Sequence, residues 1–175
     1  TDTFDRWTSS QRHRALAGVA LAAVVAAWIV RFVQDDAFIT FRFARNLERG
    51  HGLVLNQGER VEGYTNFLWT VLMAIPERFG WSAPMFSVVV GLLIMVITIV
   101  VSFRLALLVF ERESLALLSV LALVANMTFL GYGTSGLETM MQTMFVMAVA
   151  LLVLERPARS RVVARRVAAG VVAGL

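Results

Sequence analysis

Long apolar runs separated by short polar segments dominate this chain. The first run, 15–33, holds one charged residue, Arg31, near its end. As a helix rising about 1.5 Å per residue it extends roughly 28 Å, enough to cross the hydrocarbon core of a bilayer. The runs 85–103, 115–130 and 140–154 predict three more membrane-spanning helices. The pattern predicts an all-α fold, a polytopic bundle of transmembrane helices.

The two ends of this pattern need separate interpretation. The first run also suits a cleaved signal peptide, because small residues such as Ala22 and Ala26 are frequent in it. Its length favours an uncleaved anchor. A fifth apolar segment begins at residue 167 and is still apolar at Leu175. We therefore expect residues 1–175 to be the N-terminal part of a larger transmembrane domain.

The positions of the basic residues predict how the spans are oriented. Arg6, Arg12 and Arg14 precede the first run, and five arginines lie between residues 155 and 166. Arginine-rich flanks are retained on the cytoplasmic side of a membrane. The N-terminus is therefore expected to be cytoplasmic and the loop 34–82 to lie on the outer face of a bacterial plasma membrane.

Composition narrows the possible functions. Of all residues, 58% are hydrophobic and 16% are charged, which is typical of a membrane protein rather than a soluble domain. The net charge is +4, but every basic residue is an arginine, and most flank apolar runs or lie in one loop. That placement suits lipid headgroups and argues against a nucleic-acid partner. The lack of cysteine excludes disulfides and thiolate metal sites, and His13 and His51 give little support for a histidine site.

The outer loop contains one amphipathic helix. Over 37–49, apolar residues recur every four positions while the arginines form a separate stripe. This pattern predicts a helix lying in the membrane interface with its arginines at phosphate level. A guanidinium matches the geometry of phosphate, so Arg42 and Arg45 are candidates for binding a lipid-linked phosphate. Nonspecific contact with headgroups is the alternative, and it is favoured for Arg49.

A second short apolar segment, 67–75, lies later in the same loop. It is too short to span a bilayer as a helix, and Pro76 is expected to end it. We predict an interfacial or re-entrant helix with Trp69 and Trp81 near headgroup level.

Two adjacent carboxylates, Asp35 and Asp36, follow the first span directly. Carboxylates at a low-dielectric boundary are costly unless they are solvated, paired or functional. They suit an acid/base or cation-binding pair. Capping of the helix that follows is an equally good interpretation, and the two roles are compatible.

Further polar residues extend the candidate site. The stretch 56–66 is polar and contains glycine, and Glu62, Tyr64 and Asn66 offer hydrogen-bonding groups suited to sugar recognition. A plain surface turn is the alternative. Glu138 stands at the outer end of the fourth span, where an ionisable residue either lines a functional site or caps the helix.

The loop and one later motif resemble a known class of enzymes. They read DDAFITFRFARNLERGHGLVLNQGERVEGYTNFLWT over 35–70 and TSGLE over 134–138. Both are similar to GT-C-fold membrane glycosyltransferases that use polyprenyl-phosphate sugars, most of all to the mycobacterial-type cell-wall arabinofuranosyltransferases. The resemblance implies a GT-C-like bundle with amphipathic juxtamembrane helices in the first outer loop.

The resemblance also implies a mechanism. An acidic residue of the first outer loop, here Asp35, would deprotonate an acceptor hydroxyl that attacks the anomeric carbon and inverts it, while Asp36 assists. The resemblance implies three partners: a polyprenyl-phosphate sugar donor, which in this class carries arabinofuranose, a polysaccharide acceptor of the cell envelope, and membrane lipids. No cofactor is required, and a divalent cation is not indicated.

Two alternatives stay open. The same fold and mechanism would serve mannose or another polyprenyl-linked sugar. A non-catalytic scaffold or transporter would more typically carry charged residues within its spans. Here the spans are almost free of charge, and the polar chemistry concentrates in one outer loop.

Overall fold

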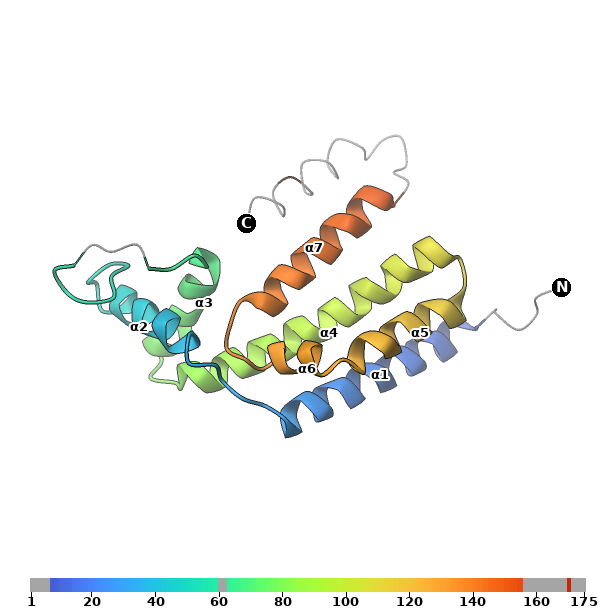
Figure 1. Ribbon diagram of the computed structural model, residues 1–175, viewed down its shortest axis with the longest axis horizontal. Coiled ribbons are helices and arrows are strands. Elements are labelled where there is room, and N and C mark those ends of the chain that lie inside the picture. Colours follow the sequence, from blue (N-terminus) through green and yellow to red (C-terminus); the bar gives the residue numbers. More distant parts are fainter. Residues whose placement is uncertain (1–6, 60–62, 156–169, 171–175) are drawn as a thin grey trace.

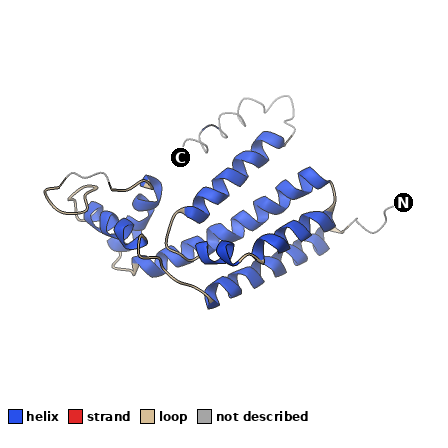
Figure 2. Cartoon of the chain, in the orientation of Figure 1, coloured by secondary structure: helices blue, strands red, loops and turns tan. Residues whose placement is uncertain are grey.

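The computed structural model describes residues 7–59, 63–155 and 170. Within these residues it contains helices and connecting loops, with no strand (Figure 2). The helices, in chain order, are α1 (Ser9–Ile29), α2 (Ala37–Glu48), α3 (Phe67–Arg78), α4 (Ala83–Phe110), α5 (Glu113–Val124), α6 (Met127–Tyr132) and α7 (Thr139–Leu154). The predicted all-α fold is confirmed.

The helices form two groups (Figure 1). The long helices α1, α4 and α5 run side by side, and α7 packs along the other flank of α4. The pair α2 and α3 packs together at one end of this bundle, where the loops 30–36 and 133–138 also lie. Helices α2 and α3 are therefore a compact unit attached to one end of the apolar bundle.

The apolar runs predict the long helices well. Two described helices, α1 and α4, are long and apolar enough to cross a membrane. α4 is longer than the predicted run because Ser82 caps its first turn, Pro84 suits that turn, and apolar residues continue past Arg104. α7 begins within one residue of the predicted run. The predicted fifth segment lies outside the described residues, apart from Gly170.

The predicted helix over 115–130 is divided into α5 and α6 at Asn126. The side-chain oxygen of Asn126 accepts hydrogen bonds from the backbone N–H groups of Thr128 (2.9 Å) and Phe129 (3.3 Å). Asparagine competes with helical backbone bonds and favours caps. Asn126 therefore caps the start of α6 and ends the predicted continuous helix.

One expectation for the segment around α3 is wrong. Pro76 does not end the helix, which continues to Arg78. A proline this close to a C-terminus removes only one backbone hydrogen bond, so the last turn can form around it. Trp69 packs inside the protein: its side chain is 1% exposed and its indole N–H donates to the carbonyl of Gly136 (2.9 Å). Trp81 is exposed and stacks on Phe79.

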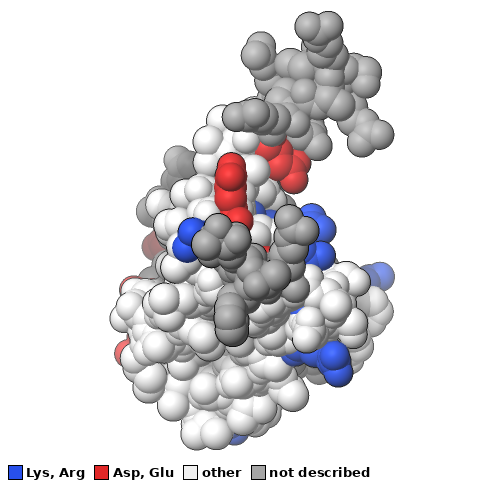
Figure 3. Space-filling model, turned by 90° about the vertical axis from the view of Figure 1, so that its right-hand side faces the viewer, with Lys and Arg blue, Asp and Glu red and all other residues white. Residues whose placement is uncertain are grey.

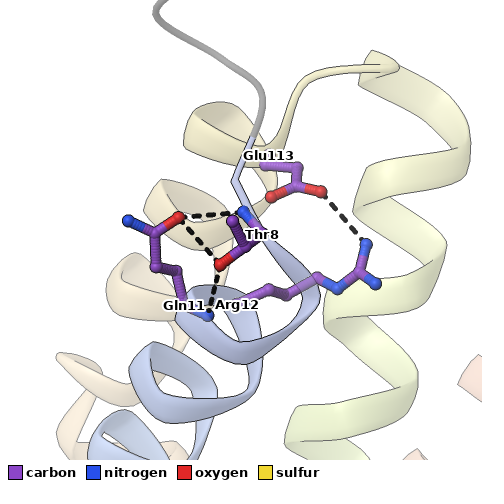
Figure 4. Close-up of polar contacts among 4 residues, drawn as sticks. All are labelled: Thr8, Gln11, Arg12 and Glu113. Carbon is purple, nitrogen blue, oxygen red and sulfur yellow. Dashed lines mark hydrogen bonds and ion pairs between the residues drawn. The ribbon is translucent and has the colours of Figure 1, made fainter.

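At the opposite end of the bundle, α1 and α5 are joined by an ion pair. Thr8 and Gln11 form a capping box at the start of α1, and Arg12 reaches Glu113 of α5 at 3.0 Å (Figure 4). This end of the molecule shows both basic and acidic side chains on a largely uncharged surface (Figure 3). The pair connects the starts of two helices that are 101 residues apart in sequence.

Candidate functional site

The start of the loop 34–82 is docked onto the 134–138 segment by backbone contacts. The N–H of Gln34 donates to the carbonyl of Ser135 (2.8 Å). Gly136 has a φ of +82°, and a Cβ there would lie 2.9 Å from the Cβ of Ala37, the first residue of α2. Only glycine fits both the left-handed backbone and the close approach. The two motifs of the sequence resemblance, DD and TSGLE, therefore lie against each other.

A network of side-chain hydrogen bonds extends this contact. The amide nitrogen of Asn66 donates to Glu138 (2.8 Å) and to Thr40 of α2 (3.1 Å), and its oxygen accepts from Thr70 of α3 (2.9 Å). Thr40 and Thr70 are buried. Asn66 thus links α2, α3 and Glu138, and both of its amide hydrogens are used within the protein.

A groove begins beside this network. It has a volume of about 620 Å³ and runs between α3 and α7. Its lining is mostly apolar, with Trp69, Phe145 and Met147 among its residues, and Asn66 and Glu138 supply a polar end. No described lining residue is basic. Only one oxygen of Glu138 is engaged by Asn66, so the carboxylate keeps an oxygen with which to accept a hydrogen bond.

Asp35 and Asp36 stand at the start of α2 with exposed carboxylates. The side chain of Asp36 makes no capping bond, so the capping interpretation is wrong for this residue. Among the described residues neither carboxylate has a hydrogen-bond or ion-pair partner, whereas both backbone carbonyls accept from the first turn of α2. Neither residue lines the α3–α7 groove. The acids are held by their backbone, and their carboxylates are free for an external ligand.

The predicted arginine stripe lines a second hollow, which we call the arginine cavity. It has a volume of about 530 Å³ and includes Arg42, Arg45 and Arg49 together with Phe38 and Asn56. Arg42 donates to the carbonyl of Leu55 (2.9 Å) and to the side-chain oxygen of Asn56 (2.6 Å). These bonds hold the NQG turn against α2, so Arg42 also has a structural role.

Arg45 is paired with a residue that the sequence pattern did not indicate. Its guanidinium makes two hydrogen bonds to Glu77 of α3, at 3.1 and 3.3 Å. The hydrogen bonds, and then the charge of the Glu77 carboxylate, raise the pKa of Arg45. Arg45 is therefore charged at any working pH, and part of its charge is offset by Glu77.

The predicted substrate-binding residues divide between two faces of α2. Thr40 contacts Asn66 on one face. At about 100° per residue, the three arginines lie roughly 140–200° around the helix from Thr40. The arginine cavity and the α3–α7 groove share no lining residue. They are separate sites with α2 between them.

The remaining candidates are less central. Tyr64 packs edge-on against Phe43 (ring centroids 5.1 Å apart), so its ring helps to hold the turn onto α2. Glu62 lies outside the described residues. Within the described part of the chain, no three His, Cys, Asp or Glu residues gather in a way that would hold a metal ion. The sequence pattern did not indicate Thr40 and Thr70, because a threonine on the apolar face of a helix does not show which residue it will contact.

Comparison with known proteins agrees with the loop resemblance over part of the chain. No family model matches, and no solved structure matches. The chain is similar to arabinofuranosyltransferases. It is 41% identical over 76 residues to the terminal beta-(1->2)-arabinofuranosyltransferase of Mycobacterium tuberculosis, covering 40% of this chain and 12% of that protein. It is 48% identical over 44 residues to the protein of the same name from Corynebacterium glutamicum, covering 25% of this chain and 6% of that protein.

These matches, together with the two apolar helices, identify a helical membrane protein related over part of its length to arabinofuranosyltransferases. The chain matches only about an eighth of the length of the Mycobacterium tuberculosis protein.

Proposed function

We propose that the protein is an inverting glycosyltransferase of the GT-C class. It transfers arabinofuranose from a polyprenyl-phosphate donor to a cell-envelope glycan on the outer face of the plasma membrane. One observation carries the proposal: the segment that contains DD docks on the TSGLE motif, about 100 residues later, through the 2.8 Å bond from Gln34, the residue before DD, to Ser135. The partial identity to two arabinofuranosyltransferases supports the choice of sugar.

Asp35 is the general base in this proposal. Its carboxylate is exposed and unpaired, so it can accept the proton of an acceptor hydroxyl. The hydroxyl oxygen bonds to the anomeric carbon while the bond from that carbon to the phosphate oxygen breaks, which inverts the centre. Polyprenyl phosphate leaves with the electron pair, and the proton stays on Asp35. Asp36, adjacent and equally exposed, orients the acceptor.

The α3–α7 groove suits the donor's hydrocarbon chain. Its apolar wall follows α7 from Met141 to Val149, a length of about 12 Å at the rise of a helix. At the polar end, the second oxygen of Glu138 is placed to accept a hydrogen bond from a sugar hydroxyl. Asn66 positions Glu138 rather than the substrate, because its own donors are already used.

The deciding experiment is transfer by the Asp35→Asn variant of the complete protein, assayed with several polyprenyl-phosphate sugars. Loss of a general base should lower the rate by about 10²–10⁴-fold with expression intact. Glu111→Gln is the matched control and should keep its activity. It removes one exposed carboxylate at the C-terminal end of α4, which lies away from α2 and α3. Near-normal turnover of Asp35→Asn would reject Asp35 as the base. Turnover with a mannosyl donor but not an arabinofuranosyl donor would keep the mechanism and change the sugar.

A further inference from the structure

The arginine cavity has the features of a built anion site. Arg49 makes no side-chain hydrogen bond or ion pair within the described part of the chain, yet it lines a hollow of about 530 Å³. Arg42 is fixed in the same hollow by Leu55 and Asn56, and its guanidinium has more N–H donors than these two bonds use. A fixed and a free guanidinium facing one hollow suit a phosphate group, which accepts several charge-assisted hydrogen bonds.

The position of the cavity separates it from the transfer site. It faces away from Asn66 and Glu138, with the body of α2 between them. The phosphate of a sugar donor is one bond from the anomeric carbon, so a donor whose sugar lies at Glu138 cannot place its phosphate across the helix. Any anion bound by these arginines is therefore distinct from the phosphate of a donor whose sugar lies at Glu138.

The apolar residues beside the arginines indicate where that ligand comes from. Phe38 lines the cavity and is 53% exposed, and Ile39 next to it is 44% exposed. Arginines with exposed aromatic and aliphatic neighbours are typical of a helix immersed in the headgroup region of a bilayer. We propose that the arginine cavity binds the phosphate headgroup of an anionic phospholipid and anchors the α2–α3 unit to the membrane surface. This site does not depend on the proposed transfer reaction.

Native mass spectrometry of the complete protein in detergent, titrated with phosphatidylglycerol, tests the proposal. Arg49→Gln should weaken phosphatidylglycerol binding by about tenfold, the loss expected for one charge-assisted hydrogen bond. Arg78→Gln removes the same charge from α3, where the side chain is 76% exposed and lies outside the cavity, and should change binding by less than about twofold. Phosphatidylcholine should bind wild type and both variants alike. Equal melting temperatures of the variants would show that neither substitution unfolds the protein.

Three results would overturn the proposal. Equal loss in Arg49→Gln and Arg78→Gln would mean that only overall charge matters. Full displacement of phosphatidylglycerol by millimolar inorganic phosphate would assign the cavity to a free anion. A higher KM for the polyprenyl-phosphate donor in Arg49→Gln, with phosphatidylglycerol binding unchanged, would assign it to the transfer site. An active Asp35→Asn variant would reject the proposed base and leave these lipid measurements unaffected.

Discussion

The side-chain amide of Asn66 donates a 2.8 Å hydrogen bond to Glu138, 72 residues later in the chain. The same amide group also bonds to Thr40 and Thr70, so one side chain connects α2 and α3 to the TSGLE segment. Glu138 is thereby fixed at the polar end of the α3–α7 groove. The position of this carboxylate depends on a residue far away in sequence.

We expect Asn66→Ala to lower both stability and transfer. It removes the hydrogen bonds to Glu138, Thr40 and Thr70, leaving partly buried groups unpaired, which costs about 1–3 kcal/mol. Thermal unfolding in detergent measures the first effect and KM for the donor the second. Gln57→Ala is the control, because Gln57 is exposed and lies outside both the network and the α3–α7 groove. Unchanged stability and KM in Asn66→Ala would contradict the role of the network.

Asn66→Asp should make the same contact sensitive to pH. It places a second carboxylate against Glu138, and two like charges in contact repel each other. The variant should therefore be least stable where both groups are ionised and should recover as the pH falls and one of them takes up a proton. Unfolding temperatures compared at neutral and mildly acidic pH check this, and the difference between variant and wild type should shrink on acidification. A constant difference would show that the two side chains do not meet.

Gly91→Ala should destabilise the contact between α4 and the segment that precedes the TSGLE motif. Gly91 of α4 lies against the backbone of Gly133, and a Cβ on Gly91 would overlap the carbonyl oxygen of Gly133. Overpacking of this kind costs about 1–3 kcal/mol. Gly18→Ala in α1 is the matched control, because a Cβ there meets nothing within 4 Å and alanine favours a helix. A lower melting temperature is expected for the first variant and an equal or higher one for the second. The reverse order would mean that the α4 contact is not formed.

The orientation of the membrane protein can be tested without removing any native thiol, because the chain has no cysteine. A cysteine in place of Gln57, exposed in the NQG turn, should react with a membrane-impermeant maleimide added outside intact cells. A cysteine in place of Glu111, exposed at the other end of α4, should react only after the membrane is permeabilised. Labelling of the Glu111 position alone in intact cells would place the candidate site in the cytoplasm and would rule out the proposed reaction.

Much of the helical layout could be predicted from local patterns. The apolar runs indicate α4 and α7, and the four-residue spacing around Phe43 indicates α2. The arginine stripe is also a property of helical spacing, and it does line one cavity. Local pattern failed at Asn126 and Pro76. Asn126 lies in an apolar run, but its side chain caps the start of α6 and so divides the run into two helices. Pro76 lacks a backbone N–H, but it lies so close to the end of α3 that the helix continues to Arg78.

The sequence by itself determined which segments are helical and apolar, because the period of an α-helix and the length of a membrane span are written in neighbouring residues. It also showed that most of the candidate site residues lie in the loop that follows the first apolar run. Only the tertiary structure decided that Asn66 meets Glu138, that Arg45 meets Glu77, and that the arginines and Glu138 lie on opposite sides of α2. Such contacts depend on how distant helices pack, and packing chooses hydrogen-bond partners by distance in space rather than by position in the chain.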